Sequence, residues 1–136
     1  MLADYANVAQ GNKLNIMGMF REIYASTFPA RHPEMTLVLQ FEPTAAEIGQ
    51  TRRLTIKLLD ADGRELLGFS RDLLIPERNP VTPPGVMGYV IHMVQLRDVV
   101  FMHPGTYAFS ILVDNDEKGT CPLVVVQPIQ KSRTKE

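Results

Sequence analysis

Apolar and polar side chains alternate along most of the chain, which is the period of a β-strand with one buried face. Residues 34–42 show the pattern most clearly, because Met35, Leu37 and Leu39 fall on one face of an extended segment. The other face carries Thr36, Val38 and Gln40. The same alternation recurs in two further segments, residues 52–60 and 106–114. The pattern therefore predicts three half-buried strands.

Shorter apolar runs predict further strands, and turn residues separate them. These runs cover residues 3–9, 13–20, 22–28, 66–75, 87–96 and 121–127. The Asp-Gly pair in the turn that begins at Asp60 favours a tight hairpin, and the segment from Asp114 predicts a second hairpin closed by Gly119. Helix signals are confined to Thr44 and Glu47, whose spacing is that of a capping box around a single turn.

Consecutive hairpins and about eight strands favour an all-β fold, an antiparallel two-sheet β-sandwich of immunoglobulin-like or related Greek-key type. Tyr107 supports this interpretation, because it follows Pro104 and Gly105 at the start of a predicted strand. This arrangement is similar to a tyrosine corner, in which the phenol bonds to the backbone near a crossover. Residues 76–88, rich in proline and glycine, predict a long surface loop.

One predicted strand is apolar on both faces and so requires a cover on each side. Tyr89, Ile91 and Met93 lie on one face. Val90, Val94 and Leu96 lie on the other, around His92. The cover is either the amino-terminal segment of this chain or a second chain, and a twofold homodimer is the expected oligomer. The candidate interface residues are Met17, Met19, Tyr89, Ile91 and Met93.

Length and composition indicate one globular domain over residues 1–130 and a disordered tail over residues 131–136. The net charge is −1, which excludes the strong basic field expected of a nucleic-acid-binding or anionic-membrane-binding protein. No apolar run approaches the ~20 residues that span a bilayer. The single cysteine, Cys121, agrees with a reducing cytoplasm. We expect a cytoplasmic protein without a membrane or nucleic-acid partner.

Aspartates in the two hairpins suggest an alternative function as a calcium- or ligand-binding sandwich. The segment from Asp114 begins like a calcium loop but places Lys118 and Val125 where oxygen ligands are needed, so a turn is the better interpretation. A cage would require aspartates from both hairpins to meet at one end of the fold. The residues concerned are Asp60, Asp62, Asp114 and Asp116.

Candidate catalytic groups are scattered along the chain. His32, His92 and His103 lack the close spacing of a zinc motif, although they could meet in space. No serine has the flanking glycines of a nucleophile elbow, and Cys121 precedes a proline at a strand start. We expect no catalytic residue and no cofactor, and a cryptic hydrolase or metal enzyme remains a third alternative.

The segments "GNKLNIMGMF", "TFPARHP" and "HPGTYAFSILV" resemble a family of small uncharacterised bacterial proteins. The resemblance covers nearly the whole chain, with Asn12 standing before Lys13 where the family has a Gly-Lys pair. It implies a cytoplasmic all-β protein of unknown function and supplies no catalytic residues. With the pattern above, it favours a non-enzymatic protein-binding or assembly module that acts through a sheet edge or loops.

Overall fold

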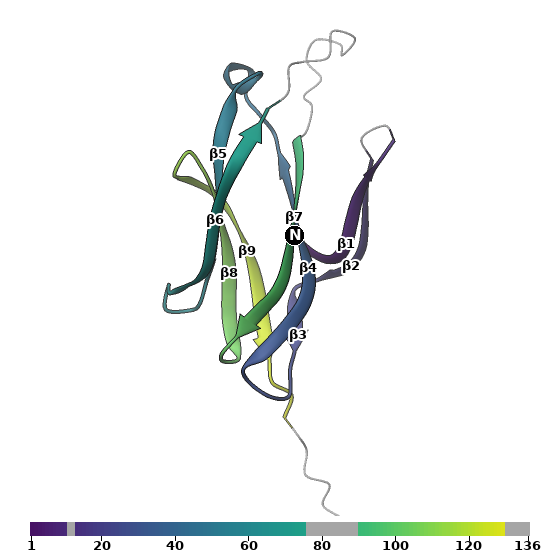
Figure 1. Cartoon of the computed structure of the whole chain (residues 1–136), viewed down its shortest axis with the longest axis vertical. Coiled ribbons are helices and arrows are strands. Elements are labelled where there is room, and N and C mark those ends of the chain that lie inside the picture. Colours follow the sequence, from purple (N-terminus) through teal and green to yellow (C-terminus); the bar gives the residue numbers. More distant parts are fainter. Residues whose placement is uncertain (11–12, 76–89, 130–136) are drawn as a thin grey trace, which may run out of the picture.

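The computed structural model describes residues 1–10, 13–75 and 90–129, and in these residues the fold is all-β (Figure 1). Nine strands are present in the described part, and the predicted capping-box segment forms a single 3₁₀ turn, η1 (Ala45–Glu47). The strands are β1 (Leu2–Ala9), β2 (Lys13–Phe20), β3 (Glu22–Tyr24), β4 (Ala30–Phe41), β5 (Thr51–Leu59), β6 (Glu65–Leu74), β7 (Val90–Phe101), β8 (Gly105–Val113) and β9 (Asp116–Val126). No helix in the described ranges is long and apolar enough to cross a bilayer.

The strands form two sheets that face each other across one core. The four-stranded sheet has the order β2-β1-β4-β7, and the five-stranded sheet has the order β3-β9-β8-β5-β6. Every pairing is antiparallel except that of β3 with β9, which is parallel. The prediction of a two-sheet all-β fold is confirmed, whereas the prediction of wholly antiparallel sheets is wrong at β3. Pairing of β3 with β9 follows a passage from one sheet to the other, which local alternation does not reveal.

The core forms where the alternating apolar faces of the two sheets meet. Leu54, Ile56 and Leu58 of β5 are fully buried, and Phe109 of β8 lies among them. Met35, Leu37 and Leu39 of β4 contribute from the opposite sheet. The predicted inner faces of residues 34–42, 52–60 and 106–114 are therefore confirmed.

Tyr107 forms the predicted corner contact. Its hydroxyl donates a hydrogen bond of 2.5 Å to the carbonyl oxygen of His103, four residues earlier. The Tyr107 ring packs edge-on against Phe101, with 5.0 Å between ring centroids and 71° between ring planes. The chain turn from β7 into β8 is thus fixed by one polar and one aromatic contact.

The two predicted hairpins exist, but one turn differs from its prediction. Gly63 has φ +81° in the β5–β6 turn, as an Asp-Gly turn requires. The β8–β9 turn is made by Asp114 and Asn115, both with positive φ, and Gly119 lies within β9 instead of closing the hairpin. Asp and Asn tolerate the left-handed conformation because their short polar side chains bond locally, so a two-residue turn suffices.

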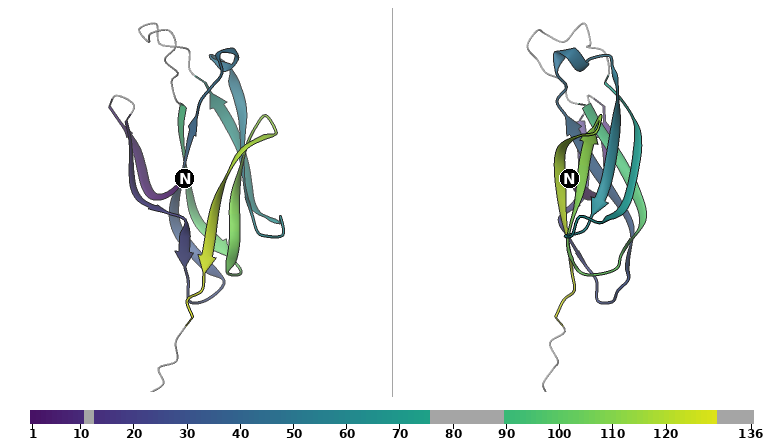
Figure 2. Two further views of the ribbon diagram at one scale, coloured as in Figure 1. Left: turned by 180° about the vertical axis from the view of Figure 1, so that it is seen from behind. Right: turned by 90° about the vertical axis from the view of Figure 1, so that its left-hand side faces the viewer.

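The β1–β2 hairpin is the edge of the four-stranded sheet and bends away from the rest of it (Figure 1). Figures 1 and 2 show it beyond β4 and β7, on the side opposite β5 and β6. Only Leu2 and Ala3 of β1 pair with β4, whereas β1 pairs with β2 from end to end. On that side of β4, Thr36 and Val38 are only 2% and 4% exposed. The prediction that these two residues lie on a solvent-facing surface is wrong, because the chain covers this part of the sheet itself.

Candidate functional site

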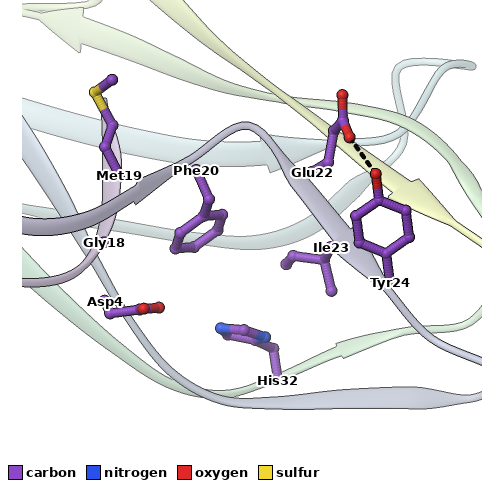
Figure 3. A pocket seen from close by; sticks show the side chains of 8 residues that line it. All are labelled: Asp4, Gly18, Met19, Phe20, Glu22, Ile23, Tyr24 and His32. Carbon is purple, nitrogen blue, oxygen red and sulfur yellow. Dashed lines mark hydrogen bonds between the residues drawn. The ribbon is translucent and has the colours of Figure 1, made fainter.

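A hollow of about 330 Å³ lies at the root of the β1–β2 hairpin (Figure 3). It forms because β2 ends at Phe20 in one sheet and the chain enters β3 of the other sheet at Glu22. The crossing leaves an opening between the hairpin, β3 and the beginning of β4. The hollow is lined by Asp4, Gly18, Met19, Phe20, Glu22, Ile23, Tyr24 and His32.

The lining side chains divide into an inner group and a rim. In Figure 3, Phe20 and Ile23 point into the hollow, and Asp4 and His32 lie opposite them. The Phe20 and His32 rings are tilted by 45°, with 5.7 Å between their centroids. Met19, Glu22 and Tyr24 extend to the other side of the ribbon and form the rim. The inner group therefore combines one carboxylate, one imidazole and two apolar surfaces.

Gly18 makes room for the Asp4 carboxylate. The β1–β2 register places the two residues opposite each other, between the pairs Ala3–Met19 and Tyr5–Met17. Gly18 has φ +69°, which glycine adopts without strain, and a Cβ at this position would overlap Asp4 Oδ2. An alternating strand would ordinarily place an apolar side chain here, so the glycine and the carboxylate together open the hollow.

At the rim, Glu22 and Tyr24 bind each other. The Tyr24 hydroxyl donates a hydrogen bond of 2.6 Å to Glu22 Oε2. Because this bond and the negative charge of Glu22 both stabilise the neutral phenol, the pKa of Tyr24 is raised above its usual range. One oxygen of the Glu22 carboxylate thus already accepts a hydrogen bond.

Neither Asp4 nor Glu22 forms an ion pair with the described residues. Five other carboxylates do, within 4 Å of an arginine or lysine nitrogen. The pairs are Arg31–Asp98, Arg52–Asp114, Arg53–Asp72, Lys57–Glu65 and Lys118–Asp116. Asp4 and Glu22 are thus two of the described carboxylates that have no cationic partner among the described residues.

The four aspartates of the predicted cage do not gather. Leu59, just before Asp60, pairs with Ala108, whereas Val113, just before Asp114, pairs with Leu54. The two turns therefore lie at opposite ends of β5, and the hypothesis of a shared cage is wrong. The sequence cannot show this, because it depends on the pairing of β5 with β8.

Backbone and arginine donors already occupy two of these aspartates, Asp60 and Asp114. Asp60 Oδ1 accepts the N–H groups of Asp62 and Arg64 at 2.9 and 2.8 Å. Asp114 Oδ1 accepts the Arg53 N–H at 2.9 Å, and its Oδ2 accepts Arg52 Nη1 at 2.9 Å. Among residues 1–10, 13–75 and 90–129, no group of three or more histidine, cysteine or acidic residues is arranged to hold a metal ion.

These contacts predict a pH dependence for Asp114. The Arg53 N–H and then the Arg52 guanidinium stabilise its charged form and lower its pKa. A carboxyl group with a lowered folded-state pKa stabilises the fold above its unfolded value, near pH 4, and loses this contribution as pH falls through the lowered pKa. Asp114→Asn should therefore be less stable than wild type at pH 7, with a difference that shrinks towards pH 2 in urea unfolding.

The matched control is Asp62→Asn, which removes a carboxylate from the other turn. The Asp62 side chain accepts no hydrogen bond from the described residues. The stability of the Asp62→Asn variant should therefore follow the wild-type pH profile. An Asp114→Asn difference that stays constant from pH 7 to pH 2 would contradict the assignment.

The three histidines lie in different environments. His32 lines the hollow, and the backbone carbonyl oxygen of His103 accepts the hydrogen bond from the Tyr107 hydroxyl. His92 pairs with Leu39, and its Nε2 is buried without a hydrogen-bond partner in the described structure. Burial, and then the nearby charge of Arg71, lower the pKa of His92. The hypothesis of a three-histidine metal site finds no support in the described residues.

The predicted interface residues fall into two groups on the same side of the fold. Met17 and Met19 of β2 are 64% and 59% exposed. Ile91 and Met93 of β7 are half-buried and pair with Gln40 and Val38 on the outer side of β4. Tyr89, like the predicted loop and tail, lies outside the described residues.

Sequence reasoning missed Tyr5, which is 48% exposed and pairs with Met17. It also missed the hollow. Its only local signal is Gly18 within an otherwise regular strand.

Residues 1–126 match the model of a family of unknown function, DUF6941. This chain belongs to the DUF6941 family. The DUF6941 match ends at Val126, where β9 ends, so it contains every strand described above together with the whole lining of the hollow. No curated protein matches the chain.

Proposed function

We propose that this DUF6941 protein is a non-enzymatic assembly module that forms a twofold homodimer through its β1–β2 hairpin. We further propose that it has an immunoglobulin-like sandwich and acts in the bacterial cytoplasm. The observation that carries the proposal is the exposed apolar surface on one face of the hairpin. The resemblance to small bacterial proteins and the single, half-buried Cys121 support the reducing compartment.

Strand order supports the immunoglobulin-like assignment. If β1, β4 and β7 take the places of strands A, B and E, the first sheet has the order A-B-E. With β5, β6, β8 and β9 as C, C′, F and G, the second sheet has the order G-F-C-C′. Both orders occur in sandwiches of this type, and a tyrosine corner near the start of strand F accompanies them. Tyr107 lies at that position in β8.

The hairpin face consists of the side chains at alternate positions of β1 and β2, namely Ala3, Tyr5, Asn7, Ala9, Lys13, Asn15, Met17 and Met19. Tyr5 and Met17 pair directly, and Met19 follows two residues along β2. Cross-strand and diagonal neighbours of this kind are about 5 to 8 Å apart, so the three side chains form one patch. Asn15 Nδ2 donates to Asn7 Oδ1 at 3.0 Å and borders the patch.

The hairpin face suits a second copy of itself. A twofold interface brings the same patch of both subunits together, so a patch with charges of one sign would repel its copy. The Tyr5, Met17 and Met19 patch carries no charged side chain, since Lys13 lies at the far end of the hairpin face beyond Asn7 and Asn15, and the chain's net charge of −1 adds little long-range repulsion. Methionine adapts its shape to irregular surfaces, which favours packing of the patch against its copy. Six of the twelve large exposed hydrophobic side chains described also fall within the first 24 residues.

Sedimentation velocity over a concentration series tests the dimer. We expect wild type to shift from monomer to dimer with increasing concentration. Tyr5→Ser with Met17→Ser should raise the dissociation constant at least tenfold, because it removes two apolar anchors from the hairpin face. Both side chains are exposed in the monomer, so the thermal midpoint of the double variant should be close to that of wild type.

A matched control replaces two equally large exposed side chains elsewhere, Leu74→Ser with Met102→Ser. This variant should dimerise like wild type. A wild-type protein that stays monomeric up to millimolar concentration, or a control that loses the dimer equally, contradicts the proposal.

A further inference from the structure

We propose that the hollow at the hairpin root binds an organic cation, either an alkylammonium or a guanidinium group. This inference concerns the inner group of Asp4, Phe20, Ile23 and His32, whereas the proposed dimer uses the hairpin face. The two are tested separately.

The charges that line the hollow favour a cation. Asp4 and Glu22 are its carboxylates, and His32 is its only titratable nitrogen base. Arg21, which lies between Phe20 and Glu22 in sequence, lines an adjoining hollow of about 420 Å³ that shares Met19, Phe20, Glu22 and Tyr24 with this one. In the described part of the chain, no lysine or arginine side chain lines the site.

Asp4 lies over Gly18 and has no bonding partner among the described residues. Its carboxylate lies over Gly18, where any Cβ would displace it. No hydrogen bond or ion pair joins it to another described residue, in contrast to Asp60 and Asp114 in the turns. A carboxylate beside apolar surface gains most from a charged donor, because such bonds are about twice as strong as neutral ones.

The apolar surfaces fit the remainder of such a ligand. The Phe20 ring faces the hollow, so a cation near Asp4 would also lie near an aromatic face. Ile23 offers aliphatic surface of the kind that the methylene stem of lysine or arginine covers. A divalent metal fits poorly, because it needs several oxygen or nitrogen ligands that converge, and Figure 3 shows Asp4 and Glu22 on opposite sides of the β3 ribbon.

Three sources could supply the cation: a free amine, a basic side chain of another protein, or the basic residues of this chain's own carboxyl end. Val126, the last residue of β9, pairs with Tyr24 at the rim. The residues that follow include Lys131, Arg133 and Lys135. All three sources present the same chemistry to Asp4.

Nuclear magnetic resonance titration of the full chain tests the proposal. The probes are N-acetyl-lysine methylamide and N-acetyl-arginine methylamide, and the uncharged N-acetyl-norleucine methylamide is the matched ligand control. We expect the cationic probes to shift the signals of Phe20, Ile23 and His32, with a dissociation constant on the order of millimolar, since the hollow is open to solvent. Added salt should weaken binding.

Two variants locate the effect. Asp4→Asn should raise the dissociation constant about three- to tenfold, because it keeps the shape and removes the charge. Asp62→Asn, at a distant exposed turn, should bind like wild type. Equal affinity for the norleucine probe, wild-type affinity in Asp4→Asn, or equal weakening in Asp62→Asn overturns the proposal.

A third variant, Lys131→Gln with Arg133→Gln and Lys135→Gln, identifies the source. If the chain's own carboxyl end occupies the hollow, this variant shifts the same signals without ligand and binds the probes more tightly. If it behaves like wild type, the cation comes from outside, and a lysine-containing peptide that binds at least tenfold more tightly than the single amide assigns it to a protein partner. Tyr5→Ser with Met17→Ser should still bind the probes, so failure of the dimer and failure of the cation site remain distinguishable.

Discussion

Replacing Val38 by aspartate is expected to lower the free energy of unfolding by about 3 to 5 kcal/mol, the range for an uncompensated buried charge. Val38 lies on the side of β4 that faces away from the core between the two sheets, yet it is almost fully buried. If the β1–β2 hairpin supplies this cover, the introduced carboxylate is enclosed without a partner. Urea unfolding followed by circular dichroism measures the change.

The matched control for Val38→Asp is Gln40→Asp, two residues along the same strand and on the same side. Gln40 is exposed, so this variant should change stability by less than about 0.5 kcal/mol. Similar stabilities for the two aspartate variants would show that the hairpin moves away from β4 in solution and does not form a fixed layer.

Tyr107→Phe is expected to destabilise the protein by about 1 to 3 kcal/mol, because it leaves the part-buried carbonyl of His103 without its donor. The ring and its edge-on contact with Phe101 remain in this variant, so the decrease in the free energy of unfolding measures the contribution of the hydroxyl alone. Thermal and urea unfolding measure the change, and the unfolded baseline should be that of wild type.

Tyr24→Phe provides the matched control, since it removes a hydroxyl whose hydrogen bond is exposed. Its effect should stay below about 0.5 kcal/mol. If both phenylalanine variants are equally stable, the corner hydrogen bond does not stabilise the turn between β7 and β8.

Alternation predicted the strands well, because a period of two is a local property of the chain. Residues 13–20 were predicted as a strand with the bounds that β2 has. Residues 22–28 were predicted as one strand, yet β3 ends at Tyr24, since its length is set by pairing with β9 and not by its own apolar residues. Periodicity therefore identifies extended segments, and partner strands determine where they end.

What covers a strand could not be predicted in the same way. The pattern in residues 34–42 distinguishes two faces, and a half-buried strand leaves the face of Thr36 and Val38 uncovered. Their partners include residues more than 30 positions earlier, since Ala3 pairs with Thr36 and Met1 forms two backbone hydrogen bonds with Val38. Residues 87–96 do carry a local signal, because both of their faces are apolar. Two apolar faces predict a cover on each side, by the amino-terminal segment or by a second chain.

The candidate site likewise depends on contacts between distant segments, which a local pattern does not predict. The turn chemistry of Asp60 and Asp114 was predictable, whereas their separation required the order of β5 and β8. The hollow depends on Asp4 lying opposite Gly18 and on His32 arriving from β4, and these residues are far apart in sequence. Spacing along the chain carries no signal for a site assembled in this manner.

The attachment of the β1–β2 hairpin to β4 through Met1, Leu2 and Ala3 has a consequence for sequence variation. Beyond these residues, β1 and β2 pair only with each other among the described strands, so adding or removing a residue pair near their tip leaves the register of β4, β7 and β9 unchanged. Hairpin length and tip sequence can then diverge between relatives while the sandwich stays constant. The hairpin is the part of this architecture in which a new binding specificity can arise without a redesign of the core.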